Sequence, residues 1–402
     1  MSVRPALPLF VVLCLISGPL TAASAGEGDW LRQACAAGKV TLDAAPGYGE
    51  GTEWAGVFYN TFVDIAAAPD GTVFAACARQ HKVFRFDAEG RLAGSFGRQG
   101  QGPGDLTSPG DLSVLDGEFL VVGEKPDLRR VSLFRLDGTF AKLLTTKSAA
   151  FRVVGLREGK IAYSSRHSQM SPRSVLETTE RVFIKDVGSG AEVQVAEFHD
   201  EQRMIDGKTL ALKFNQGVAH IARTAGGDLV VGDCFEPTVQ VYSPDGRKVR
   251  DVNLDMAPSL VTRPFLKGFR ESRIREWQDD PRVNEAGLKM RIDNLDKVLY
   301  EGTLDQPLPL YRALYTDPDG RLVFFLTPRD FEATGHTLKA FEPDGKAIGE
   351  FRLEPGRWGI EVDPTKRHFA FTDRGLYVLA ENKDAADYEL RIIRADLPGR
   401  AD

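Results

Sequence analysis

Residues 86–109 read FDAEGRLAGSFGRQGQGPGDLTSP, and this stretch shows the repeated unit of the chain most clearly. Phe86 ends one expected strand, residues 87–90 form a tight turn, and a second strand ends at Phe96. A glycine-rich loop then leads through Pro109 into the apolar segment 112–122. A unit that ends in this way and begins again is a repeat, and the rest of the chain contains further copies.

Each repeat is expected to hold four short antiparallel strands. In the first copy the strands cover 62–66, 72–76, 82–86 and 91–96, separated by turn residues at 69–71 and 87–90. Asp and Gly recur at these turns because a two-residue hairpin needs positive φ, which Gly adopts without steric cost. Further copies are expected at 112–143, 151–198, 218–254, 310–353 and 360–397, the last of them divergent.

Spacings of roughly 40–50 residues are typical of β-propellers, whose sheets stack around a central channel. We therefore predict an all-β, six-bladed β-propeller over residues 61–398. The alternatives are a β-sandwich and a string of small β domains. We further predict that Val40–Asp43, within the N-terminal segment 26–60, adds an outer strand to the sixth blade and closes the ring. Deleting residues 26–44 would then lower the melting temperature.

One segment interrupts the repeats, at about residues 258–303 between the fourth and fifth blades. Pro264 suits a helix first turn after Thr262, and a second helix is expected over 284–300 because Leu288, Ile292, Leu295 and Leu299 recur at helical spacing. This helical insertion is interpreted either as a pad on a blade edge or as a lid over the channel mouth.

The N-terminus resembles a secretory signal. Residues 1–25 contain Arg4, a short apolar run over 10–16 and small residues up to Ala25, where cleavage is expected. The alternative is an N-terminal membrane anchor, which normally needs a longer apolar run. Since no later stretch is apolar enough to span a membrane, we predict a secreted or periplasmic protein.

The composition is that of an ordinary globular protein, with 402 residues, 42% hydrophobic and 27% charged. The net charge of −6 argues against nucleic acid as a partner. After removal of residues 1–25, Cys35, Cys77 and Cys234 remain, so at least one has no intramolecular disulfide partner. Their pairing cannot be assigned from spacing.

The stretch from Phe96 to Leu106 resembles the junction between blades in secreted bacterial six-bladed β-propellers related to NHL repeats, which read F-G-x-x-G-x-G-x-G-x-F before a proline. Leu106 replaces the usual aromatic residue, and Pro109 is kept. The resemblance implies binding modules for ligands or proteins, with a few lyases and lactonases on related scaffolds. The glycine loop is interpreted as a tight crossing between blades and not as a phosphate cradle, since no helix with Lys-Ser/Thr follows.

Candidate site residues follow from the register of the inner strands, which line the channel. Five polar side chains are expected there: Asp64, Asp111, Arg152, His220 and Arg312. The two arginines offer forked donors, so they favour an anionic or zwitterionic ligand. The alternative is that each residue pairs with a neighbour and simply fills a wet channel.

No cofactor is predicted. Only His220 among the six histidines falls on an inner strand, which disfavours a three-histidine zinc site. Asp64 and Asp111 leave calcium or another divalent ion as an alternative. We predict a monomeric, non-enzymatic binding module for a small polar ligand or a protein at the channel mouth. The alternative is a metal-assisted lyase or hydrolase with an axial site.

Overall fold

The computed structural model describes residues 29–42, 62–125, 129–172, 175–205, 209–210, 219–280, 283–299, 303–329, 331, 335–356, 358–359, 368–372, 375–382 and 389–395. The expected signal sequence at 1–25 lies outside these residues. Of the helices in the described ranges, none has both the length and the apolar character needed to cross a membrane.

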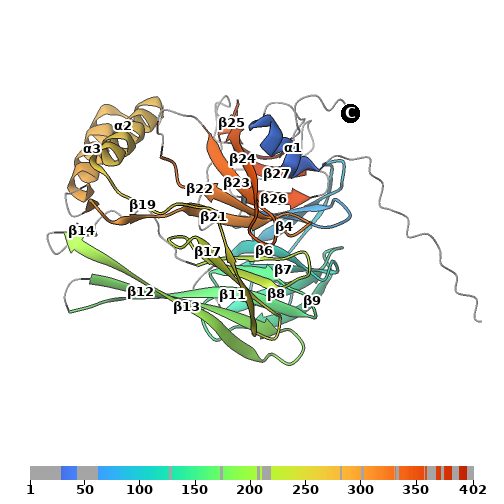
Figure 1. Ribbon diagram of the computed structural model, residues 1–402. Helices are drawn as coiled ribbons and strands as arrows, with labels where there is room; N and C mark the ends of the chain where they lie inside the picture. The colour runs from blue at the N-terminus through green and yellow to red at the C-terminus, as the bar shows by residue number, and fades with distance from the viewer. Residues whose placement is uncertain are drawn as a thin grey trace, which may run out of the picture.

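Five consecutive sheets form complete antiparallel blades of a β-propeller (Figure 1). Blade 1 contains β2 (Phe62–Ala67), β3 (Val73–Cys77), β4 (Lys82–Phe86) and β5 (Leu92–Phe96). Blade 2 contains β6 (Pro109–Leu115), β7 (Phe119–Glu124), β8 (Arg130–Arg135) and β9 (Phe140–Thr145). Blade 3 contains β10 (Arg152–Gly155), β11 (Lys160–Met170), β12 (Val175–Asp186) and β13 (Glu192–Ile205), with β14 (Thr209–Leu210) added at its edge.

Blade 4 contains β15 (Ala219–Arg223), β16 (Leu229–Asp233), β17 (Thr238–Tyr242) and β18 (Lys248–Asn253). Blade 5 contains β21 (Tyr311–Thr316), β22 (Leu322–Leu326), β23 (His336–Phe341) and β24 (Ala347–Glu354). The inner strands β2, β6, β10, β15 and β21 contact one another in chain order. Each of the first five predicted repeats, with its two turns, therefore corresponds to one blade of the propeller.

The predicted number of six four-stranded blades is wrong, because the described residues give five. The C-terminal sheet contains β25 (Trp358–Gly359), β26 (Phe369–Thr372), β27 (Gly375–Asn382) and β28 (Glu389–Ala395). β25 and β26 both pair with β27, each with a different part of it, and β28 also pairs with β27, so the ladder is narrower than a four-stranded meander. β26 contacts both β21 and β2, so this narrower sheet fills the gap between blades 5 and 1.

The predicted ring closure is also wrong. β1 (Lys39–Thr41) pairs in parallel with β24 and widens blade 5, where the prediction placed Val40–Asp43 on the sixth blade. The helix α1 (Trp30–Ala37) precedes it, and the Trp30 ring makes edge contacts with Phe351 and Phe371. Burial of this helix on blade 5 fixes the place of β1, and the short amphipathic helix gave no clear signal in the sequence.

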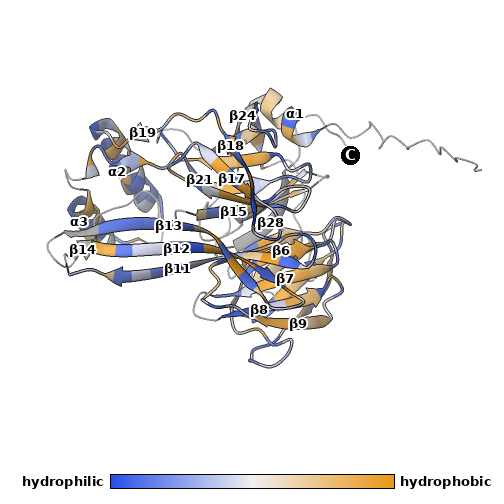
Figure 2. Ribbon diagram, turned by 60° about the horizontal axis from the view of Figure 1, so that its bottom comes forward, coloured by the Kyte–Doolittle hydropathy of each residue, from blue (hydrophilic) through white to orange (hydrophobic). Residues whose placement is uncertain are grey.

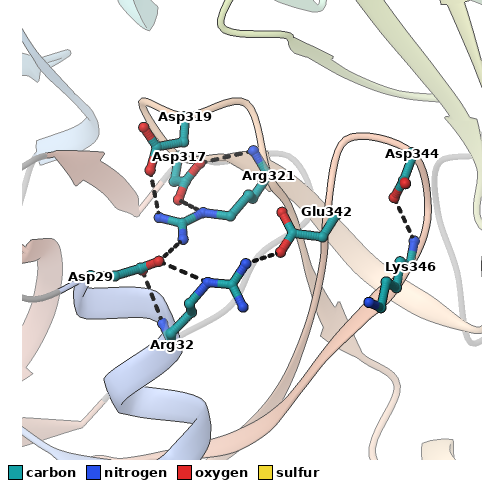
Figure 3. A network of polar contacts seen from close by, with 8 residues as sticks. All are labelled: Asp29, Arg32, Asp317, Asp319, Arg321, Glu342, Asp344 and Lys346. Carbon is teal, nitrogen blue, oxygen red and sulfur yellow. Dashed lines mark hydrogen bonds and ion pairs between the residues drawn. The ribbon is translucent and has the colours of Figure 1, made fainter.

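A polar network fastens α1 to the same blade (Figure 3). The guanidinium of Arg321 forms ion pairs with Asp29, Asp317 and Asp319. Arg32 extends the network to Glu342. Asp29 also caps the helix by accepting from the backbone N–H of Arg32 at 3.1 Å.

The hydrophobic core lies between neighbouring blades. One cluster joins blades 1 and 2 through Phe74, Leu112 and Phe134, and an equivalent cluster joins blades 4 and 5 through Val230, Tyr311 and Phe324. Burying apolar side chains between two sheets is what makes the stacked arrangement stable, since one sheet alone leaves a face exposed.

The glycine loop folds around its own acidic residue. Asp105 accepts from Arg98 Nε at 2.7 Å and from the backbone N–H of Gly102 at 3.0 Å. Gly97 has φ +85°, and a Cβ there would lie 2.5 Å from the Leu106 side chain. The Asp105 carboxylate thus occupies hydrogen-bond donors of the loop, which agrees with the interpretation of the loop as a blade junction.

The two helices of the insertion form where they were expected. α2 (Arg263–Asp279) has Thr262 as N-cap and α3 (Glu285–Val298) has Asn284, and each cap accepts a backbone N–H three residues later. The short pair β19 (Ser259–Leu260) and β20 (Pro307–Leu308) closes the base of the insertion. No residue of α2 is fully buried, which disfavours the interpretation as a pad on a blade edge.

Candidate binding site at the channel entrance

Four of the predicted site residues occupy matching positions on the inner strands. Asp64, Asp111, Arg152 and His220 lie on β2, β6, β10 and β15, and all four are at least 90% buried. Each sits near the start of its strand. Because all inner strands run in the same direction, these side chains belong to one end of the channel, here called the entrance.

Arg152, His220 and Tyr311 form a chain of contacts across blades 3, 4 and 5. Arg152 Nη1 lies 3.0 Å from His220 Nδ1. Since a guanidinium only donates, His220 Nδ1 accepts and the ring proton belongs on Nε2. The His220 ring meets the Tyr311 ring edge-on, with centroids 5.2 Å apart. Burial raises the pKa of the Tyr311 hydroxyl well above its usual value, so it stays protonated and donates.

The chain ends at Asp233, the last residue of β16. Tyr311 Oη donates to the backbone carbonyl of Asp233 at 2.9 Å. Burial raises the pKa of the Asp233 carboxyl, against the opposing effect of the Phe235 backbone N–H. Asp233 lies on the second strand of blade 4, and strand pairing sets it opposite Ala219, the neighbour of His220 on the inner strand.

Asp64 has a structural contact that the sequence did not reveal. Its Oδ2 accepts from the backbone N–H of Leu112 at 2.6 Å, and its Oδ1 accepts from that of Ile65 at 2.8 Å. The carboxylate therefore joins the inner strands of blades 1 and 2. Asp111 is buried at the matching position on blade 2.

Arg312 does not join the other four. It lies one residue before the matching position, at a bulge between Tyr311 and Ala313, and its Nη2 is 3.2 Å from His336 Nδ1 on the third strand of blade 5. Burial, with a smaller effect of Arg273 in α2, lowers the pKa of Arg312 to about 10. All five predicted residues therefore lie on inner strands, and Arg312 differs from the other four by pairing with His336 within its own blade.

Two projecting elements flank the entrance. Beyond Ser164, the partner of Arg152, β11 continues to Met170 and pairs with β12 as a long hairpin. The helical insertion leaves blade 4 and enters blade 5 at the same end. In Figures 1 and 2 the hairpin and the two helices extend on the same side of the blades, and Figure 2 shows much of the outer hairpin as hydrophilic.

Buried charges also lie at the base of the hairpin. Glu180, with its side chain 1% exposed, accepts from Arg166 Nη2 at 3.2 Å, and Arg166 stacks over the Phe151 ring. Glu180 also accepts the backbone N–H of Ala219 at 3.4 Å. This ion pair fixes the hairpin against the residue next to His220.

Within the described ranges, no group of three or more His, Cys, Asp or Glu side chains could hold a metal ion. The carboxylate of Asp64 is engaged by two backbone donors, so the residues predicted for calcium are a poor fit. Cys35, Cys77 and Cys234 form no disulfide with one another.

Sequence reasoning missed Tyr311 and Asp233, although one signal was present. Gly232 interrupts an apolar strand, which often marks a close approach of another group. A Cβ at Gly232 would lie 2.3 Å from Tyr311 Oη. The glycine therefore makes room for the tyrosine that connects His220 to Asp233 in the chain of contacts.

Comparison with known proteins gave structural likenesses alone. No family model matches the chain, and no curated protein matches it. A predicted exported protein from Bacteroides fragilis is 8% identical with a TM-score of 0.47, covering 89% of this chain and 98% of that one. A DUF4221 protein from Bacteroides vulgatus is 10% identical with a TM-score of 0.43, covering 85% of this chain and 94% of that one. A predicted gluconolactonase is 12% identical with a TM-score of 0.42, covering 89% of this chain and 94% of that one. These likenesses concern the fold alone and say nothing about ligand or reaction.

Proposed function

We propose that this protein is a binding module that takes a small zwitterionic or anionic ligand at the channel entrance. The observation that carries the proposal is the buried chain Arg152–His220–Tyr311, which draws one side chain from each of three blades. Buried charged groups are costly unless they have a purpose in structure or binding.

The arrangement suits a ligand with a carboxylate and an amine. The forked guanidinium of Arg152 is a fitting donor to a carboxylate. Asp233, whose pKa is raised by burial, would gain from an ammonium partner that stabilises its charged form. A protein partner would use the same entrance by inserting a charged side chain or a chain end between the hairpin and the helices.

We also propose that the mature chain acts outside the cytoplasm as a monomer without a bound metal. The signal sequence expected at 1–25 supports the compartment. Elemental analysis of the purified protein tests the metal, and size-exclusion chromatography with light scattering tests the oligomeric state.

The test uses the free L-amino acids and small dicarboxylates as probes, screened by thermal shift and measured by calorimetry. For the best amino acid, its amide and its deaminated acid separate the two charges. Arg152→Gln should weaken binding roughly 10- to 100-fold, the usual effect of losing a hydrogen bond between charged groups. Asp233→Asn should remove the preference for the amino acid over its deaminated acid.

The matched control is Arg135→Gln, an exposed arginine paired with Glu118 in the turn between the first two strands of blade 2, which should leave binding unchanged. Binding should also strengthen as pH rises through the raised pKa of Asp233, because the carboxylate must be charged to hold an ammonium. If no probe binds, or if Arg152→Gln binds as well as the unmodified protein, the proposal is wrong.

A further inference from the structure

Arg312 is a partly buried cation on the inner strand of blade 5, and its hydrogen-bond partner in the described part of the chain carries no negative charge. Its Nη2 lies 3.2 Å from Nδ1 of His336, which accepts as a neutral imidazole. Burial lowers the pKa of the guanidinium to about 10, and no carboxylate of the described residues opposes that effect. Buried charges are normally paired, because an unpaired one is costly. The surroundings of Arg312 therefore favour an anionic partner.

The helix α2 is held against blade 5 by aromatic contacts. The Phe331 ring, from the connection between β22 and β23, meets the rings of Phe265 and Phe269 with centroids 5.1 and 5.9 Å apart. Arg275 donates to the Phe331 carbonyl at 3.1 Å. A Cβ at Gly268 would lie 2.9 Å from the Phe331 side chain, so the glycine lets the helix come close. These contacts fix which face of α2 is turned towards blade 5.

A second cation, Arg273, belongs to this face of α2. Its guanidinium lies over the Phe269 ring, 5.7 Å from the ring centroid, and its charge contributes to lowering the pKa of Arg312. Arg273 pairs with Glu276 at 2.6 Å, but the two side chains are 46% and 60% exposed, and such pairs contribute little. Two cations thus approach each other from the helical insertion and from blade 5. They repel each other unless an anion lies between them.

Both arginines keep donors for such an anion. On Arg312, Nη2 is used by His336 and Nε is buried. Nη1 of Arg312 is neither buried in that way nor hydrogen-bonded within the described residues, and the side chain is partly exposed. On Arg273, Nη1 faces Glu276, so Nε and Nη2 remain. The remaining donors therefore lie on accessible parts of both side chains.

We propose that Arg312 and Arg273 together bind an oxyanion of the phosphate class, either inorganic phosphate or the phosphate group of a small metabolite. One oxygen accepts from Nη1 of Arg312 and another from the guanidinium of Arg273. A tetrahedral oxyanion suits this pair because its oxygens point in several directions, whereas the two oxygens of a carboxylate lie in one plane. The bound anion joins α2 to blade 5 and makes the helical insertion a lid. The chain Arg152–His220–Tyr311 takes no part, so this site does not depend on the proposed zwitterion site.

The test is a calorimetric titration of the mature protein with inorganic phosphate, in a buffer without other oxyanions. One phosphate should bind per chain, and acetate should bind at least about tenfold more weakly. Arg312→Gln and Arg273→Gln should each weaken phosphate binding about tenfold or more, the usual effect of losing a hydrogen bond between charged groups. Glycerol 3-phosphate separates the two sources: tighter binding than that of phosphate identifies a phosphate monoester, and equal or weaker binding identifies the free ion.

Hydrogen exchange tests the lid. Because the anion joins α2 to blade 5, phosphate should slow exchange of the α2 backbone amides by about threefold or more in the unmodified protein. The same addition should leave α2 exchange unchanged in Arg312→Gln.

Arg291→Gln is the matched control, because Arg291 is an exposed arginine on α3 of the same insertion, 5.8 Å from the centroid of the Trp277 ring. It should bind phosphate as well as the unmodified protein does. Thermal melts establish that each variant is folded, and Arg273→Gln, at an exposed side chain, serves if Arg312→Gln does not fold. Absence of phosphate binding at millimolar concentration, unchanged binding in both Arg312→Gln and Arg273→Gln, or unchanged α2 exchange would overturn the proposal. Loss of phosphate binding in Arg152→Gln with full binding in Arg312→Gln would place the anion in the channel and would overturn it as well.

Discussion

Replacing Arg321 by Met should destabilise the protein through the acid that it leaves behind. Asp317 has a side chain that is 4% exposed, and it receives Arg321 Nε at 2.6 Å and the Arg321 backbone N–H at 2.8 Å (Figure 3). The variant keeps the backbone donor and loses the guanidinium. The other two partners contribute little, because Asp319 is 73% exposed and Asp29 is 32% exposed.

The expected loss is about 3 kcal/mol in the free energy of unfolding, at the lower end of the cost of breaking a buried ion pair. At roughly 2 °C per kcal/mol for a protein of this size, the melting temperature should fall by about 6 °C. Urea unfolding and thermal melts of the mature protein measure both quantities.

The pH dependence has a definite sign. Burial already raises the pKa of Asp317 despite Arg321, and removing the guanidinium should raise it further. An acid whose folded pKa lies above its unfolded pKa costs stability when ionised. The deficit of the variant should therefore be largest at neutral pH and shrink as pH falls through the folded pKa towards the unfolded value of about 3.9.

The double variant Arg321→Met/Asp317→Asn is the matched control, because it removes the uncompensated charge and should recover much of the loss. Asp319→Ala should change stability by less than about 0.5 kcal/mol. A loss below about 1 kcal/mol for Arg321→Met, or a double variant no more stable than the single one, would refute the reasoning.

Three further variants test other parts of the fold by urea unfolding. Trp30→Ala should cost about 3–5 kcal/mol, since the ring is 7% exposed between Phe351 and Phe371, and a loss below about 1 kcal/mol would contradict the docking of α1. Asp64→Asn should cost about 1–3 kcal/mol. An amide can accept through only one of its two terminal atoms, so the backbone N–H of Ile65 or that of Leu112 would lose its acceptor. Unchanged stability would exclude a role for Asp64 in joining blades 1 and 2. Gly97→Ala should cost at least about 1–2 kcal/mol from its positive φ. Gly226→Ala is the comparison that should be milder, because its φ is not positive and the nearest atom to its Cβ lies 3.7 Å away.

The sequence predicted the repeat because each turn carries local chemistry. Gly71, Gly90 and Gly138 all have positive φ at the turns where Asp-Gly or similar residues were noted. The helical insertion was predictable for the same reason, since Thr262 and Asn284 cap their helices through neighbours three residues away. Local signals of this kind need no knowledge of the rest of the chain.

Contacts between distant segments were not predictable. The parallel pairing of Val40 with Leu353 depends on where α1 docks, and that docking rests on Arg321, almost three hundred residues later in the chain. The sixth blade was inferred from a divergent copy without a second Asp-Gly turn, and the structure there gives a narrower sheet. The number of blades depends on how the ring of sheets closes, so counting repeats in the sequence does not determine it.

The candidate site was predicted in part, for a similar reason. Register predicted all five residues on inner strands, and all five lie there, because an inner strand is a short, regular ladder. Arg312 is the bulged residue between Tyr311 and Ala313, and its side chain contacts His336 within the same blade. Tyr311, in the core between blades 4 and 5, is the blade 5 residue that meets His220, a contact that only the three-dimensional packing reveals.

The two ends of the propeller differ in a way that bears on function. Within each blade, the turn between the first and second strands and the turn between the third and fourth strands lie at the end away from the entrance. These are the short turns with positive-φ glycines, such as Gly71, Gly227 and Gly246. The long hairpin of blade 3 and the helical insertion both lie at the other end. Loops that carry function vary on a rigid scaffold, while turns that only connect strands remain short. The end with Arg152 and His220 is therefore the end where binding is expected.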